Sequence, residues 1–285
     1  MKRNKASTAK GYSLHIGINK VDPNHYQGWD GELTACEFDA KDMNDLAKSK
    51  GFNNRKVLLT KQATRNAVIS ELTKLSKKLV SGDILFISYS GHGGQLPDKN
   101  NDENDNNDET WVLYNGEIVD DELYSLYSQF ASGVRIIVLS DSCHSGSVVK
   151  QVHYSRVYGE QKRYRAMPNS VAARTYRANQ SFYDKILSNP KLSENNPKKK
   201  TFKNQLKASV RLISGCMDNQ LSLDGSFNGL FTETFLNVWN NGSFKGTYGK
   251  LASKINQQMP ADQTPNHLVI GSVNSKFNSE QAFSV

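Results

Sequence analysis

Two short motifs in this chain combine residue types that could perform nucleophilic catalysis. His92 lies in the run Tyr89-Ser-Gly-His-Gly-Gly94, and Cys143 lies in Asp141-Ser-Cys-His-Ser-Gly146. A thiolate can attack an acyl carbon, and a histidine can activate the thiol and later protonate the leaving amine. The pair predicts a cysteine protease with Cys143 as the nucleophile and His92 as the general base and acid.

The glycines after the histidine suit this chemistry, because a backbone without Cβ atoms can approach a substrate closely. The N–H groups of Gly93 and Cys143 are the candidate oxyanion-hole donors. His144 is a rival base, but adjacent side chains usually point apart, which favours His92.

The alternative to a catalytic pair is a loop histidine together with an inert, buried cysteine. Each is common by itself, but two such motifs at two strand ends favour catalysis. Cys36 and Cys216 are weaker candidates for the nucleophile because neither has a Gly-His partner motif.

Each motif follows an apolar run that predicts a buried strand. Short runs rich in Ile, Val and Leu are typical of strands covered on both faces. The predicted strands are 12–19, 56–60, 84–89, 134–140, 210–214 and 267–272. Helical patterns lie between them, at 37–50, from 64 to 79, at 120–130, 181–187, 228–239 and 248–259.

This alternation predicts a mostly parallel, three-layer α/β sandwich. Parallel strands would bring both motifs to the carboxyl edge of the sheet, where neighbouring strands lie about 5 Å apart. The acidic, Asn-rich run 98–109 is expected to be a surface loop.

The composition is that of an ordinary globular chain. A length of 285 residues suits one large domain or two small ones. We expect a single domain over 1–285, with a portion at about 10–150 that carries the histidine and cysteine, a basic linker at 151–205 and a small portion at 206–285. No signal-peptide pattern or long apolar run is present, and three cysteines are too few for a disulfide framework, so a cytoplasmic protein with reduced thiols is expected.

The net charge of +8 is concentrated in one segment. Residues 150–207 hold 14 Lys/Arg and 3 Asp/Glu, a local charge of +11, which leaves −3 for the rest of the chain. A nucleic-acid-binding face would instead combine clustered basic residues with aromatics on a folded surface. The segment is therefore interpreted as a solvated charge run, a protease-sensitive linker or an arm for an acidic partner.

Six motifs together resemble the caspase-type cysteine peptidases of clan CD, most closely the metacaspases and their bacterial relatives. The separation of 51 residues between His92 and Cys143 is also similar to that of caspases. The matching runs are 14–19, 35–43, 82–93, 119–123, 141–146 and 214–220. The resemblance implies the caspase-hemoglobinase fold, with a six-stranded and largely parallel sheet, and a Cys143/His92 dyad.

The resemblance also implies cleavage after arginine or lysine. Asp141 precedes the nucleophile by two residues, and Asp39 stands at the metacaspase specificity position, with Cys36 and Ser90 as pocket neighbours. Two carboxylates in one pocket would attract a cationic side chain and reject an acidic one. The alternatives are an exposed helix residue for Asp39 and a structural acceptor of loop amides for Asp141.

Two further acidic residues are candidates for this pocket, Asp218 and Asp224. The chemistry itself needs no cofactor. Many metacaspases need calcium, however, and the resemblance points to Asp120 and Asp121, joined by Asp105 or Asp108, as ligands of an activating ion.

The basic segment gains a role under this interpretation. We predict a zymogen that cleaves itself at Arg163, Arg165, Arg174 or Arg177. Alternatively, the segment occupies the pocket as an inhibitor until it is displaced.

Three other functions remain open: a catalytically silent scaffold of the same fold, a basic binding protein that uses residues 150–207, and an aspartate-specific enzyme. The expected partners are a protein or peptide substrate with a basic residue before the cut and an upstream activator protein. Neither nucleic acid nor membrane is expected to bind, and a monomer is expected.

Overall fold

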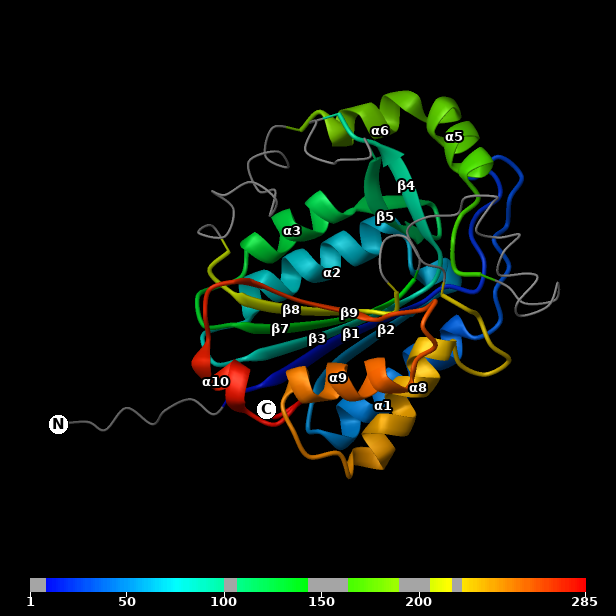
Figure 1. The fold of residues 1–285 in the computed structure, drawn as a ribbon. Coiled ribbons are helices and arrows are strands. Elements are labelled where there is room, and N and C mark those ends of the chain that lie inside the picture. Colours follow the sequence, from blue (N-terminus) through cyan, green and yellow to red (C-terminus); the bar gives the residue numbers. More distant parts are fainter. Residues whose placement is uncertain (1–8, 100–106, 143–163, 190–205, 217–221) are drawn as a thin grey trace.

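A six-stranded sheet with the order β2-β1-β3-β7-β8-β9 forms the centre of the molecule (Figure 1). In this computed structural model the described residues are 9–99, 107–142, 164–189, 206–216 and 222–285. The first five strands in this order are parallel, and β9 is antiparallel to β8. The strands are β1 (Gly11–Gly17), β2 (Asn54–Leu59), β3 (Ile84–Ser90), β7 (Arg135–Asp141), β8 (Ser209–Ser214) and β9 (Asn266–Gly271).

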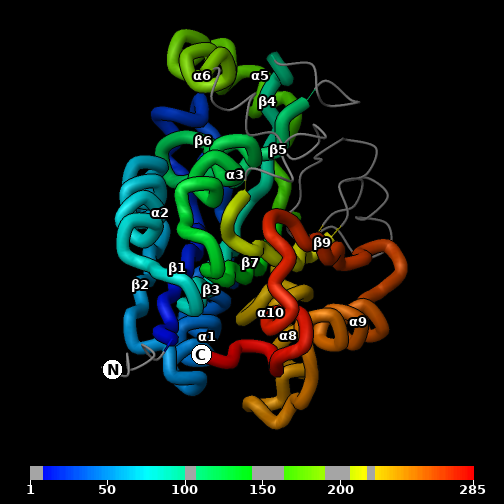
Figure 2. The backbone as a smooth tube through the Cα atoms, turned by 90° about the vertical axis from the view of Figure 1, so that its left-hand side faces the viewer, coloured from blue at the N-terminus to red at the C-terminus, as the bar shows by residue number. Residues whose placement is uncertain are grey.

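Helices cover both faces of this sheet (Figures 1 and 2). One layer consists of α2 (Arg65–Lys78) and α3 (Asp120–Ser128), and the other of α1 (Cys36–Ser49), α8 (Leu230–Trp239) and α9 (Tyr248–Gln258). The predicted three-layer α/β sandwich is confirmed, and each predicted strand and helix is present with shifts of a few residues at its ends. Three shorter elements are η1 (Thr60–Gln62), η3 (Asn240–Gly242) and α10 (Ser275–Ser279).

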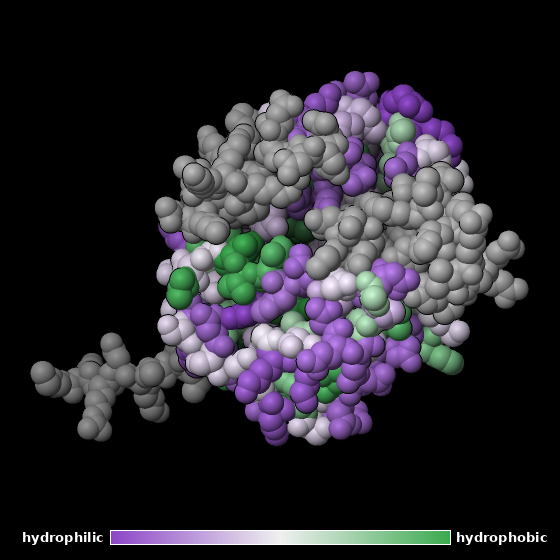
Figure 3. Space-filling model, viewed as in Figure 1, coloured by the Kyte–Doolittle hydropathy of each residue, from purple (hydrophilic) through white to green (hydrophobic). Residues whose placement is uncertain are grey.

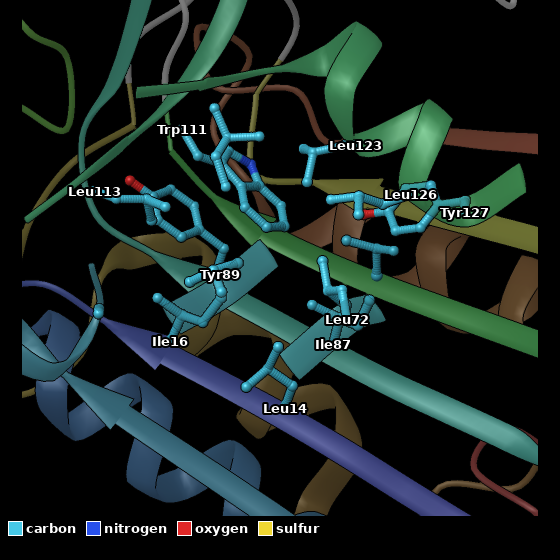
Figure 4. Close-up of a cluster of buried hydrophobic side chains, with 14 of the residues drawn as sticks. Leu14, Ile16, Leu72, Ile87, Tyr89, Trp111, Leu113, Leu123, Leu126 and Tyr127 are labelled. Carbon is cyan, nitrogen blue, oxygen red and sulfur yellow. The ribbon is translucent and has the colours of Figure 1, made fainter. Parts of the chain in front are cut away.

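Alternation along β3 explains how one strand holds two helical layers. Its seven residues are all buried. Ile87 and Tyr89 pack into the apolar cluster beneath α2 and α3, which Figure 4 shows, whereas Ile84 and Phe86 pack into the cluster beneath α1, α8 and α9. Successive strand side chains point to opposite faces, so a continuous apolar run is what a doubly covered strand requires.

A second, three-stranded sheet was not predicted. It consists of β4 (Gly93–Pro97), β5 (Asn107–Leu113) and β6 (Gly116–Val119), in antiparallel order β4-β5-β6. Three glycines and many polar residues obscure the period-2 pattern of these strands. The expectation of a surface loop over 98–109 is wrong at its end, because residues 107–109 belong to β5 and Asp108 is buried.

Two helices lie within the basic segment: α5 (Asn169–Ala178) and α6 (Gln180–Leu187). Only the second was predicted. They pack over the β4–β6 sheet (Figure 1) and bury Val171, Ala172 and Tyr183. The phenol of Tyr183 lies 2.7 Å from His25 Nε2, which ties α6 to the loop after β1.

The edge strand β9 leaves apolar side chains at the surface. Leu268 is 42% exposed and Val269 51% exposed, and Figure 3 shows a hydrophobic area on the face of the molecule that includes this strand. A cavity of about 150 Å³ lies between α3 and strands β7 to β9, lined by Tyr124, Tyr127 and Leu212 among others. Among the described residues, no helix has the length and apolar character needed to cross a bilayer.

Candidate active site

Strands β3 and β7 end side by side at the same edge of the sheet, and each is followed in the sequence by one of the two predicted catalytic residues. Ser90 is the register partner of Asp141 in the parallel ladder, and each is the last residue of its strand. His92 follows Ser90 by two residues, and Cys143 follows Asp141 by two. Cys143 itself lies outside the described residues, so the structure describes the strand that leads to it but not the thiol.

The imidazole of His92 is held from one side and buried. Its Nε2 lies 2.9 Å from the carbonyl oxygen of Gly31, and the ring centroid lies 4.8 Å from that of Trp29. A carbonyl only accepts hydrogen bonds, so Nε2 must carry the proton. In the neutral ring Nδ1 is then the basic nitrogen, and it has no hydrogen-bond partner among the described residues.

Burial lowers the pKa of His92 to about 4 and outweighs the Gly31 carbonyl, which favours the protonated ring. The resting imidazole is therefore neutral near pH 7, which is the form that a general base needs. Sequence reasoning had no means of finding Trp29 and Gly31, because the loop that contains them carries no recognisable motif.

Three carboxylates converge behind the end of β3: Asp39 on α1, Asp141 at the end of β7, and Asp224 in the loop before α8. Asp39 and Asp141 are 1% and 2% exposed. Ser90 donates to Asp39 Oδ2 at 2.6 Å. The structure thus brings Asp39, Ser90 and Asp141 together with Asp224, the further candidate for this pocket, which forms its third acidic wall.

The guanidinium of Arg165 fills this pocket. Arg165 Nη2 lies 2.6 Å from Asp39 Oδ2 and 3.0 Å from Asp224 Oδ1, and Nη1 lies 2.8 Å from Asp141 Oδ2. Arg165 is completely buried, and Nη1 also donates to the hydroxyl of Ser90 at 2.8 Å. A buried arginine among three acids is a counterion for them, which distinguishes it from a solvated basic run.

The carboxylates of Asp141 and Asp224 also have partners other than Arg165. Asp141 accepts from Ser222 Oγ at 2.8 Å and from the amide and hydroxyl of Thr232. Asp224 accepts from the amide and hydroxyl of Thr34. These bonds to groups other than Arg165 fix the positions of both carboxylates.

Asp39 is held in the same way by Asn228 and by the amide of Gly229. Burial nevertheless raises the pKa of Asp39 to about 6, against the opposing effect of the neighbouring Arg165. The negative charge of Asp39 therefore depends on a cation in the pocket.

Gly229 leaves the space that the guanidinium of Arg165 occupies. A Cβ on Gly229 would stand 2.4 Å from Arg165 Cζ, so only glycine leaves space for the guanidinium there. Cys36 is also buried at this site, and burial raises the pKa of its thiol, which keeps the thiol neutral and argues against a nucleophilic role.

The backbone around Arg165 runs through the site in an extended form. Arg165 N donates to Ser222 O at 3.0 Å, and Tyr164 forms an antiparallel bridge with Leu223. The amide of Gly93, the predicted oxyanion donor, donates to the Arg165 carbonyl at 2.9 Å. The next residues continue beside β4, where Met167 N donates to Gly93 O at 2.7 Å.

Several predicted residues fall outside the description. Cys143, His144, Asp105, Arg163 and Asp218 lie among residues that the structure does not describe. Arg174 and Arg177 are within α5.

The predicted calcium ligands lie at one end of the β5–β6 ladder. Thr110 pairs with Val119. Asp108 lies two residues before Thr110, and Asp120 and Asp121 directly follow Val119, so the three come from adjacent strand ends. Asp108 and Asp121 are buried. Carboxylate oxygens suit calcium, but the part of the chain that the structure describes contains no group of three His, Cys, Asp or Glu placed to hold a metal ion.

Comparison with known proteins shows the family of this chain. The caspase-domain family model of the C14 peptidases matches residues 14–280. The chain belongs to this family. A crystallised protein from Geobacter sulfurreducens is 52% identical to it with a TM-score of 0.85, over 97% of this chain and 99% of the other.

Fungal metacaspases are similar over a shorter stretch. Metacaspase-1A of Aspergillus clavatus is 39% identical over 158 residues, which are 50% of this chain and 35% of the relative. Metacaspase-1 of Coccidioides immitis is 37% identical over 159 residues, 50% of this chain and 32% of the relative. The match thus spans about a third of the length of these curated relatives.

The buried ion cluster predicts a pH-dependent loss of stability when its cation is removed. Arg165→Ala should lower the free energy of unfolding by about 3 kcal/mol near neutral pH, because three carboxylates lose their shared partner. The pKa of Asp39, already raised to about 6, should rise further. A carboxyl group with a raised folded pKa contributes stability at low pH and loses it as the pH rises through that value.

Urea unfolding of wild type and Arg165→Ala at about pH 5 and about pH 7.5 measures this effect, with a smaller difference expected at the lower pH. Arg174→Ala is the matched control, because Arg174 is exposed on α5. Equal losses at both pH values, or a loss no larger than that of the control, would contradict the assignment of Arg165 as the counterion.

Proposed function

We propose that this chain is a cysteine endopeptidase that cleaves after arginine or lysine with a Cys143/His92 dyad. One observation carries the proposal: Arg165 has its side chain on three carboxylates while its carbonyl oxygen accepts from Gly93 N–H. An arginine held at both ends in this manner has the contacts that a substrate residue needs before the cut.

The chemistry follows from the positions of the groups. The thiolate of Cys143 attacks the carbonyl carbon of the basic residue, and Gly93 N–H stabilises the oxyanion that forms. His92 Nδ1 takes up the thiol proton and then gives it to the leaving amine. Water hydrolyses the acyl-enzyme, with His92 as the base.

The Gly31 carbonyl supports this role of His92. By accepting from Nε2, it keeps Nδ1 free for proton transfer and orients the ring, as a third residue does in a catalytic triad. A carbonyl carries no full charge, so it orients the ring without stabilising the imidazolium as strongly as a carboxylate would.

The acidic pocket supports a basic substrate over an acidic one. An aspartate side chain would meet three fixed carboxylates and no cation other than the arginine it must displace. Arginine should be preferred over lysine, because its planar fork can contact all three acids at once while an ammonium group is a compact charge on a flexible stem.

Peptide hydrolysis tests this proposal. Of matched fluorogenic peptides ending in Arg, Lys or Asp, the Arg peptide should be cut fastest, the Lys peptide more slowly and the Asp peptide not at all. Cys143→Ala should abolish all cleavage.

Gly229→Ala should reduce cleavage after Arg by about 100-fold or more, because the added methyl group occupies the place of the guanidinium. Gly249→Ala is the matched control, since its Cβ would meet only ordinary contacts. Cleavage after Asp would oppose the proposal. No cleavage of any peptide, in a protein whose Cys143 thiol still reacts with a thiol-reactive probe, would also oppose it and would favour a scaffold.

We further propose that the protein is a zymogen that cleaves itself at the Arg165–Ala166 bond. The side-chain and carbonyl contacts of Arg165 support this bond over the other candidates. Arg174 and Arg177 are helical in α5, and a cleft that pairs with an extended backbone does not accept a helix. Until it is cut or displaced, the same segment excludes other substrates from the pocket.

Fragment analysis measures the self-cleavage site. Wild-type protein should yield a fragment that begins at Ala166, and Arg165→Gln should block its formation, whereas Arg165→Lys should slow it. Arg174→Gln serves as the control and should process normally. An Ala166 fragment in a purified Cys143→Ala protein would show that another protease makes the cut.

Calcium is proposed as an activator that acts outside the chemical steps. When bound, the ion would be held by Asp120 and Asp121, at the end of the β5–β6 ladder that leads to β4 and Gly93, together with Asp105 or Asp108. Chelator should then lower activity at least about tenfold, and Asp121→Asn should raise the calcium concentration that is needed. Thermal unfolding with and without calcium gives a second readout. Activity and melting temperature that chelator does not change would exclude this role.

A further inference from the structure

Gly94 lies at the contact between the Arg165 segment and β4. A Cβ on Gly94 would stand 2.8 Å from Met167 Cε, 2.8 Å from Glu117 Oε2 and 2.9 Å from Thr110 Oγ1. The thioether end of Met167, a carboxyl group and a hydroxyl group are therefore close neighbours around one glycine. Met167 is 1% exposed, so this side chain fills the space that the missing Cβ leaves open.

Met167 is the second residue after the Arg165–Ala166 bond. Its backbone is held by Gly93, because Met167 N donates to Gly93 O at 2.7 Å and Ala166 bridges Gly93 in a parallel register. A chain that runs beside a strand edge places alternate side chains on the same face. The side chain at Arg165 enters the acidic pocket, and two residues later the side chain at Met167 enters this second space.

Glu117 forms the polar end of that space. It is completely buried on β6, and Thr110 Oγ1 donates to its Oε2 at 2.6 Å. Among the described residues its other oxygen, Oε1, has no hydrogen-bond partner, although the phenol of Tyr183 lies near the carboxyl group. A buried acceptor without a partner costs free energy, and a substrate side chain that ends in a donor could satisfy it.

We infer that Gly94, Thr110 and Glu117 form a second specificity pocket, which selects a long unbranched side chain at the second residue after the cut. The inference rests on the proposed function, because the pocket selects substrates only if the Arg165 segment lies in the cleft as a substrate does. Methionine fits this space in the protein's own segment. Lysine also fits, because its amine is one atom beyond the position of Met167 Cε and so reaches toward Glu117.

The acid–base behaviour of Glu117 predicts how this choice changes with pH. Burial raises its pKa to about 7, against the bond from Thr110 and the neighbouring Tyr183. The phenols of Tyr26 and Tyr89 also interact electrostatically with Glu117, and Arg65 Nε donates to the backbone carbonyl of Glu117. Below about pH 7 the carboxyl group is neutral and suits methionine; above it the carboxylate favours a cation.

The test uses internally quenched peptides with Arg-Ala-X across the cut, where X is Met, Lys, Glu or Gly, and the purified, self-processed full chain. At about pH 6, Met should exceed Gly by about tenfold in kcat/KM, as burial of one apolar side chain predicts, and Glu should be the poorest. The Lys-to-Met ratio should rise as the pH passes about 7, because Glu117 ionises.

Glu117→Gln should make this ratio independent of pH, and Glu233→Gln, on the exposed side of α8, is the matched control. Glu117→Asp keeps the charge and serves if the glutamine variant fails to fold; it should retain a pH-dependent ratio.

Equal cleavage of all four peptides, or a ratio that depends on pH in the same way in Glu117→Gln, would overturn the inference while leaving the proposed endopeptidase intact. No cleavage of any Arg-Ala-X peptide by wild-type protein would instead refute both.

Discussion

A single buried arginine organises the functional side of this molecule. Arg165 is enclosed by carboxylates that come from α1, from the end of β7 and from the loop before α8. Taking one cation and three anions out of water is costly unless each charge keeps close partners. Hydrogen bonds to the three acids supply those partners, and they join parts of the chain that are far apart in the sequence. The pocket and the segment that fills it therefore stabilise each other.

The central sheet makes such a cluster possible. Strands β3 and β7 are buried on both faces and pair in register to their last residues, so the loops that carry His92 and Cys143 begin at the same level. The two apolar clusters on opposite faces of the sheet hold this register, because a slip of one residue would turn every side chain to the other face. Rigid strands thus position groups that loops alone could not hold.

The small β4-β5-β6 sheet extends the site beyond the acidic pocket, along the residues that follow Arg165. Gly93 contributes to three features: its N–H contacts the Arg165 carbonyl, its carbonyl accepts from Met167, and its strand pairs with β5. Because β4 is an edge strand of the β4-β5-β6 sheet, the residues after Arg165 run beside it as a further strand of that sheet. The acidic pocket and the space around Gly94 are then successive parts of one groove that follows an extended chain.

The sequence by itself determined the main strands and helices, the strands covered on both faces, and the positions of His92 and Asp141, since apolar runs and Gly-flanked motifs are local signals. Asp39 and Ser90 were identified through the resemblance to the metacaspases. The sequence also predicted that the basic segment could enter the pocket. It also offered Asp224 as a further candidate for that pocket. Only the tertiary structure decided which arginine enters, and that Gly229, Gly31 and Glu117 complete the site. Those residues owe their roles to contacts between chain segments as distant as Asp39 and Arg165. No local pattern records such contacts, because packing of the whole chain creates them.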